Sequence, residues 1–176
     1  QTVLREAQDE LRLDTEATIA EFKALAGRYR LLHLATHAQA NPEQGDFSFI
    51  VFSDGQGGYD SLFAKDLYPL SIEAELVILS ACETALGTIY NSEGVISLAR
   101  GFHYAGARSV LTTLWSINDG ANCTLMSSFY QELDRGESKK DALHMAKQAL
   151  MEQDDELAHP VFWAGFQLLG NPRPIN

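Results

Sequence analysis

The sequence predicts an α/β fold, a sandwich built around a mostly parallel central sheet. Three observations support this prediction: strand-like and helix-like segments alternate, one segment is almost wholly apolar, and reactive side chains follow two strand-like segments at their carboxyl ends. The chain has 176 residues and 45% hydrophobic content, which is enough for one sizeable core. We therefore expect a single folded domain with one main sheet.

The first segment has a helical pattern. Residues 1–27 are rich in Ala, Glu, Leu and Arg, with apolar positions three or four residues apart, and Gly27 lies where a helix would end. We expect residues 1–28 to form an N-terminal helix or a linker to an upstream segment, and residues 29–176 to form the domain proper. The chain begins at Gln1, and we interpret it as a piece of a longer protein.

The other elements follow from local pattern. The segment "AELVILSA" is nearly all apolar, which is typical of a central parallel strand covered on both faces. The Gly-rich stretch "GQGG" predicts a hairpin or bulge turn between two strands. In chain order we predict strands at 29–38, 47–54 and 59–64, a strand at 74–81, a helix at about 94–104, a strand at 108–115, helices at about 119–134 and 138–153, and a short helix or strand within 159–170.

Charge and composition narrow the classes of partner. The chain carries 13 Lys and Arg against 24 Asp and Glu, a formal charge of −11, which argues against nucleic acid or an anionic membrane as the main partner. No apolar run approaches the roughly 18 residues that span a bilayer. The two cysteines, Cys82 and Cys123, form neither a CxxC pair nor a metal-ligand cluster with histidine. We expect no metal, no cofactor and a reducing, cytoplasmic location.

Two strand ends carry the residues of a candidate dyad. The strand "LLHLATHA" leads to His37, and the strand "ELVILSAC" leads to Cys82. If these strands are parallel neighbours, an imidazole and a thiol emerge at the same edge of the sheet, where α/β proteins bind ligands. A thiolate that attacks a carbonyl and a histidine that protonates the departing amine form a standard hydrolytic pair.

The same residues resemble a known family. A hydrophobic block ending in His, a spacer and a second block ending in Ala-Cys is the arrangement of caspase-like peptidases, and the 45-residue separation of His37 and Cys82 is close to the roughly 50 residues of caspases. The strings "LHLATHA", "LVILSACETALG", "EGVISLARGFHYAGARSVLTTLW" and "HPVFWAGFQLLGNP" resemble the motifs of the CHAT domain, a caspase-like module usually attached to tetratricopeptide repeats. The resemblance covers about residues 29–172.

The resemblance implies a fold and an activity. The fold is a three-layer αβα sandwich of the caspase–haemoglobinase type. The activity is that of a cysteine endopeptidase, with His37 and Cys82 as the catalytic pair and a bacterial regulatory or defence setting. By analogy, the backbone N–H groups of Ala38 and Cys82 form the oxyanion hole. Many relatives have Gly after the histidine, so Ala38 is a mild departure. The implied partners are a protein or peptide substrate and upstream tetratricopeptide repeats.

Substrate preference does not follow the signatures of caspases or metacaspases. Two residues before the cysteine, where metacaspases carry an acid, this chain has Ser80, which predicts a roomier or less polar pocket that takes Leu, Met or another uncharged side chain. Trp115 and Asp119, in the loop "LWSINDG", are further candidates for substrate binding, and Asp119 leaves a basic side chain open.

Plainer roles compete with chemistry at several positions. His33 lies deeper in an apolar run and is predicted to be a satisfied core histidine. His159 is predicted to pack and cap beside Pro160, and Cys123 is predicted to be a core or semi-exposed thiol in a helix. For the whole chain, the alternatives to an endopeptidase are a catalytically silent interaction module and another thiol hydrolase on the same fold.

Overall fold

A four-stranded sheet forms the centre of the computed structural model, which describes residues 10–41, 43–80 and 92–175. The strand order is β1-β5-β6-β7, in which β1, β5 and β6 run parallel and β7 runs antiparallel to β6. The predicted mostly parallel sheet is therefore confirmed. Its strands are β1 (Leu31–Leu34), β5 (Leu76–Leu79), β6 (Ser109–Thr113) and β7 (Phe166–Gly170).

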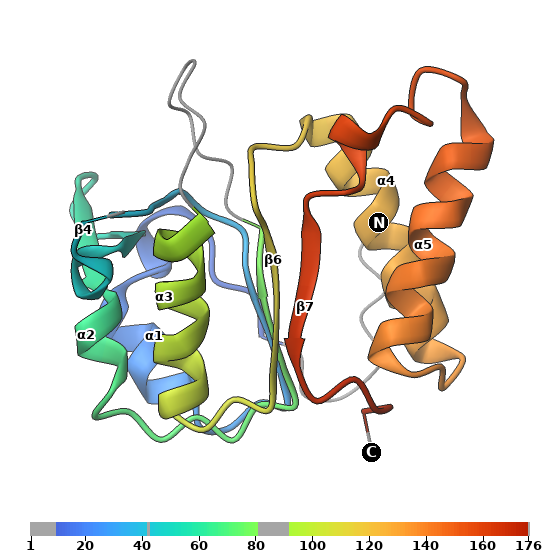
Figure 1. Ribbon diagram of the computed structural model, residues 1–176. Helices are drawn as coiled ribbons and strands as arrows, with labels where there is room; N and C mark the ends of the chain where they lie inside the picture. The colour runs from blue at the N-terminus through green and yellow to red at the C-terminus, as the bar shows by residue number, and fades with distance from the viewer. Residues whose placement is uncertain (1–9, 42, 81–91, 176) are drawn as a thin grey trace.

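Helices cover both faces of this sheet, which gives the expected three layers (Figure 1). All four residues of β5 are buried, and their side chains alternate between two cores. Val77 and Leu79 belong to the core beneath the helices α1 and α3, while Leu76 and Ile78 belong to the core beneath α4 and α5. These helices are α1 (Ile19–Leu25), α3 (Ser92–Tyr104), α4 (Asp119–Asp134) and α5 (Lys139–Gln153).

A second, smaller sheet lies on the α1 and α3 side. It has the order β2-β3-β4 and is antiparallel, with β2 at Ala38–Gln39, β3 at Phe49–Ser53 and β4 at Tyr59–Phe63. The predicted hairpin turn joins β3 to β4, where the carboxylate of Asp54 accepts hydrogen bonds from the N–H groups of Gln56 and Gly58. The short helix α2 (Ala64–Leu67) follows β4, and its Leu67 is fully buried.

The predicted helix over residues 1–27 is wrong for most of its described part. Residues 10–13 are not helical, Asp14–Glu16 form one 3-10 turn, and α1 begins only after Thr18. Asp14 has a left-handed φ of 46°, which interrupts a regular helix, and Thr18 is extended and accepts the N–H of Glu21 as the N-cap of α1. Phe22 of α1 is buried and packs against Phe52 and Phe102.

The strand predicted over residues 29–38 is two separate strands. β1 ends at Leu34, and the chain then leaves the main sheet and joins the small one at Ala38. The hydroxyl of Thr36 donates to the carbonyl of Val51 (2.7 Å), which fixes the crossing. The other predicted strands and helices are found close to their predicted positions, and residues 159–170 contain both a 3-10 turn (Pro160–Phe162) and β7.

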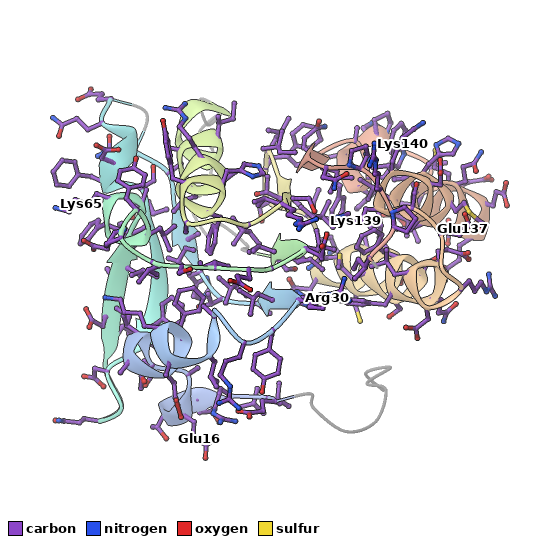
Figure 2. All side chains as sticks on the ribbon, turned by 90° about the horizontal axis from the view of Figure 1, so that it is seen from below. Glu16, Arg30, Lys65, Glu137, Lys139 and Lys140 are labelled. Carbon is purple, nitrogen blue, oxygen red and sulfur yellow. The ribbon has the colours of Figure 1, made fainter. Side chains whose placement is uncertain are left out.

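An ion cluster lies at the amino ends of the parallel strands. Glu75, just before β5, has its carboxylate 3.3 Å from Arg108, 3.8 Å from Arg30 and 3.6 Å from Lys139. Lys139 is completely buried and also donates to the carbonyl of Glu75 at 3.0 Å, and Ser109 donates its hydroxyl to the same carbonyl. Figure 2, the view from below, shows Arg30 and Lys139 close to each other near the middle of the molecule.

Candidate active site

The candidate site is built at the carboxyl ends of β1 and β5, which are parallel neighbours as the dyad prediction required. The register pairs Leu34 with Leu79, so that each residue of β1 lies opposite the residue 79 − 34 = 45 positions further along the chain. The ladder continues one step further, because the N–H of Ser80 donates to the carbonyl of Leu34 (3.1 Å). His37 follows the end of β1 by three residues. Cys82 is the third residue after β5 and lies outside the described residues.

The structure holds His37 where the chain passes between the two sheets. Its carbonyl accepts the N–H of Val51 at 2.8 Å, and Thr36 next to it is bonded to the carbonyl of the same residue. Thr36 and His37 are thus both bonded to Val51 of β3, Thr36 to its carbonyl and His37 to its N–H. His37 is exposed.

The backbone N–H of Ala38 points away from β3. His37 bonds directly to Val51, and the register places Ala38 opposite Ile50 and Gln39 opposite Phe49. In an antiparallel pair, hydrogen-bonded positions alternate with non-hydrogen-bonded ones. Ala38 therefore occupies a non-hydrogen-bonded position, and its N–H is directed away from β3. Its methyl group packs against the core, so the departure from Gly is accommodated on the inner side.

Ser80 is tied to the start of α4. Its hydroxyl accepts a hydrogen bond from the side-chain amide of Asn122 at 2.7 Å. Asn118 caps the same helix, with its side-chain oxygen accepting the N–H groups of Gly120 and Ala121. Among the described residues, the side-chain oxygen of Asn122 is buried without a hydrogen-bond partner. Sequence reasoning missed Asn122, because a polar residue in the first turn of a helix carries no sign of its partner on another strand.

Trp115 and Asp119 follow β6 and therefore lie on the other side of β5 from His37. The indole N–H of Trp115 donates to the carbonyl of Val161 (2.8 Å), and its ring lies against Gly165, where an added Cβ would be 2.9 Å from the ring. Trp115 is 38% exposed, so it is held by these contacts while part of the residue remains accessible to solvent. Asp119 is exposed at the first position of α4.

His33 forms a polar pair with Tyr130 of α4, on the face of the sheet opposite to the small sheet. The tyrosine oxygen lies 2.7 Å from Nδ1 of His33, and the rings are 5.9 Å apart. Desolvation lowers the pKa of His33 and raises the pKa of Tyr130, and in both residues it favours the neutral form. This bond confirms that His33 is satisfied, but the predicted core position is wrong, because His33 is exposed.

The predicted capping role of His159 is confirmed. His159 caps the 3-10 turn at Pro160–Phe162, with its ring nitrogen accepting the N–H of Val161. Cys123 lies on α4 as predicted, but it is a free, exposed thiol and not a core or semi-exposed one. Within residues 10–41, 43–80 and 92–175 there is no group of three His, Cys, Asp or Glu side chains arranged to hold a metal ion. In the same part of the chain, no helix has the length and hydropathy to cross a membrane.

Comparison with known proteins agrees with this arrangement. A family profile described as the CHAT domain matches residues 1–171. The chain belongs to the CHAT domain family. Mouse tetratricopeptide repeat protein 28 is 33% identical over 115 residues, and its human counterpart is 32% identical over the same length. Each alignment covers 65% of this chain but only 5% of the relative, so this CHAT domain spans about a twentieth of the curated relatives it matches.

Membership explains the architecture described above. A mostly parallel sheet with helices on both faces agrees with the caspase-like fold of CHAT domains. The names of the two relatives agree with the expected association with tetratricopeptide repeats. The CHAT match begins at residue 1 and so includes the segment that contains α1.

Proposed function

We propose that this CHAT domain is a cysteine endopeptidase that uses Cys82 as its nucleophile and His37 as its acid and base. The observation that carries the proposal is the strand register. β1 and β5 are parallel with an offset of 45 residues, and His37 and Cys82 are separated by the same number, 82 − 37 = 45. Two residues that stand three positions beyond the paired ends of neighbouring strands start from the same edge of the sheet.

The reaction follows from these two groups. His37 takes the proton of the Cys82 thiol, and the thiolate attacks the carbonyl carbon of the scissile peptide bond. His37 then gives the proton to the departing amine as the C–N bond breaks, which leaves a thioester on Cys82. A water molecule, deprotonated by His37, attacks that thioester and releases the carboxylate product and the free thiol.

The oxyanion of each tetrahedral intermediate needs fixed donors. We propose the backbone N–H groups of Ala38 and Cys82 for this role. The support for Ala38 is its non-hydrogen-bonded position opposite Ile50, which directs its N–H away from β3. A main-chain donor fixed by a sheet needs little reorganisation when charge develops on the substrate.

The residue before the scissile bond is proposed to be uncharged. Ser80 is small, and its hydroxyl is already bonded to Asn122, so it presents no charge to a substrate side chain. Trp115, which follows β6 and so lies on the β6 side of β5, offers a fixed apolar surface. Leu or Met fits these surroundings. Asp119 is the one proposed pocket residue that would favour Lys or Arg instead.

The wider setting remains a proposal as well. We propose that the enzyme is cytoplasmic and acts on a partner protein. Its catalytic domain is proposed to comprise residues 29–176, with tetratricopeptide repeats upstream of it in the full-length protein. The two curated relatives are mouse and human proteins, so they lend no support to the bacterial regulatory or defence setting that the resemblance implied.

Chloromethyl ketones of short peptides with different last residues test the dyad. We expect labelling of Cys82 in the wild type, strongest with Leu or Met, none in Cys82→Ala, and much slower labelling in His37→Ala. The exposed Cys123 supplies the internal control for ordinary thiol reactivity. Equal labelling of Cys82 and Cys123, regardless of the peptide, would favour the catalytically silent interaction module.

A further inference from the structure

The small sheet has one face against the core and an opposite, outer face, and His37 lies at one edge of the outer face. Ile50 and Leu62, which face each other across β3 and β4, are buried in the core. Residues alternate between faces along a strand, so Phe49 and Val51 lie on the opposite, outer face, and so does Phe63 across from Phe49. His37 bonds directly to Val51 and shares this outer face with it.

Apolar rings gather on this face next to His37. Phe63 contacts Phe49 on one side (ring centroids 5.7 Å apart) and Phe47 on the other (6.2 Å). We call the four residues Phe47, Phe49, Val51 and Phe63 the aromatic strip. None of them belongs to either of the two described cores, and Phe47 is 42% exposed. The strip is therefore an apolar surface that the described fold leaves partly open.

Lys65 adds a charge to one end of the strip. Its ammonium lies 4.5 Å from the centroid of Phe47 and 5.4 Å from that of Phe63. The Lys65 side chain is exposed, and Figure 2 shows it at the outer side of the small sheet, away from α4 and α5. A basic side chain bound on the strip would meet this ammonium, whereas an apolar or acidic one would not be repelled.

The chemistry of the site determines which half of a substrate would lie here. A histidine that protonates the departing amine must lie beside the nitrogen of the scissile bond. The segment that begins at that nitrogen, the leaving segment, therefore starts at His37. The candidate residues for the other half, Ser80, Trp115 and Asp119, lie on β5 or beyond it on the β6 side. The substrate thus runs across β5 toward the small sheet.

On the basis of the endopeptidase function proposed above, we propose that the aromatic strip binds the leaving segment of the substrate and selects an apolar or aromatic side chain in it. Directly opposed residues of a sheet have Cβ atoms about 5 Å apart, and diagonal neighbours lie about 7–8 Å apart. Val51 is opposite His37, Phe49 is diagonal to it, and Phe63 is one strand further. At about 3.3 Å per extended residue, the strip faces the second to fourth residues after the scissile bond.

Peptide cleavage by the full chain tests this proposal. The substrates are internally quenched peptides that share one sequence before the scissile bond and carry Phe, Leu, Ser, Glu or Lys at the second, third or fourth residue after it. We expect the wild type to cleave the Phe and Leu peptides about tenfold faster, in kcat/KM, than the Ser peptides, with Lys the slowest. Phe49→Ser is expected to abolish the preference for Phe and Leu, and Lys65→Glu to relieve the discrimination against Lys.

A matched control lies on the same face. Tyr59 is 84% exposed and pairs with Ser53, which is as far from Val51 as Phe49 is, but in the opposite direction. Tyr59→Ser is expected to leave the preference intact. A loss of preference in Tyr59→Ser, with none in Phe49→Ser, would place the leaving segment at the other end of the face and overturn the proposal.

A second probe separates this proposal from the dyad. Peptidyl chloromethyl ketones carry no residues after the reactive carbon, so Phe49→Ser is expected to label at the wild-type rate, which also shows that the variant is folded. Normal labelling with equal cleavage of the Phe and Ser peptides overturns the strip and leaves the dyad standing. If the wild type shows no peptide-dependent labelling of Cys82, the dyad fails and the strip proposal fails with it.

Discussion

The two ends of the parallel strands are built in opposite ways. At the amino ends, Glu75 is surrounded by Lys139, Arg30 and Arg108, and both its carboxylate and its carbonyl have partners. At the carboxyl ends, His37 is exposed and its backbone carbonyl accepts the N–H of Val51, and the side-chain oxygen of Asn122 lies buried without a described partner. The same sheet thus has a cluster of paired charges at one end and an exposed histidine at the other.

This difference separates stability from chemistry. A buried lysine and a nearly buried carboxylate are costly to place inside a protein unless each is paired, so changes at the amino ends should act on folding. An exposed imidazole contributes little to folding, so changes at His37 should act on catalysis. The four predictions below compare the effects of substitutions on catalysis and on stability, beginning with one position at each end of the strands.

The largest expected effect is at the carboxyl end. His37→Gln is expected to lower kcat/KM by about 10³-fold, because the acid and base of the reaction is lost. The free energy of unfolding should change by less than about 0.5 kcal/mol, since the side chain is exposed. Peptide hydrolysis and urea denaturation measure the two quantities. A large loss of stability would show that the two ends are not separate.

The next effect is at the amino end. Glu75→Gln is expected to lower the free energy of unfolding by about 3 kcal/mol, because the buried Lys139 then lacks its counter-charge. The rate of Cys82 labelling in the folded fraction should not change. The double variant with Lys139→Met is the control, since removing both charges should restore part of the loss. If the double variant is as unstable as Glu75→Gln alone, or if the two losses of stability add, Glu75 and Lys139 are not a coupled pair.

A smaller effect is expected where α4 meets the end of β5. Asn122→Ala removes the hydrogen bond to Ser80 and should lower the free energy of unfolding by about 1 kcal/mol. Ser80→Ala removes the same bond, so the double variant should lose little more than either single one. Denaturation of the three variants gives the coupling directly, and full additivity would contradict it.

The smallest effect is a pH dependence at His33. Because desolvation lowers its pKa in the folded chain, the unfolded chain binds a proton first as the pH falls. The stability contribution is complete above the ordinary histidine pKa and is lost as the pH falls through the folded value. Denaturation at pH 7.5 and at about pH 5 should show a smaller decline for His33→Gln than for wild type, while His144→Gln, at an exposed position on α5, should decline like wild type.

Most of the main sheet could be predicted from the sequence because its strands are strongly apolar. Within the run at 74–81, the four residues from Leu76 to Leu79 are all apolar, and all four are buried as that pattern predicts. The sequence did not itself pair β1 with β5; their parallel pairing was the condition for the dyad, and the structure meets it. The helix predicted over residues 1–27 is wrong for residues 10–18, because apolar spacing alone does not reveal the left-handed φ of Asp14.

The small sheet was harder to foresee. The segment 29–38 reads as one strand, and only the bonds of Thr36 and His37 to Val51, fifteen and fourteen residues later, divide it between two sheets. The Ser80–Asn122 bond and the His33–Tyr130 pair likewise join residues 42 and 97 positions apart. Such contacts depend on tertiary packing, which a local pattern does not contain. The dyad itself remains a prediction, since Cys82 lies outside the described residues.

The register of β1 and β5 also bears on how such sites are recognised in other chains. The hairpin of β3 and β4 lies in the chain between β1 and β5, so its residues are included in the 45-residue offset. The turn of this hairpin is at the surface. Residues added to or removed from that turn would alter the count without moving the ends of β1 and β5. A fixed spacing between histidine and cysteine is therefore a weak criterion for related sequences. Position relative to the two strand ends is the quantity that insertions preserve.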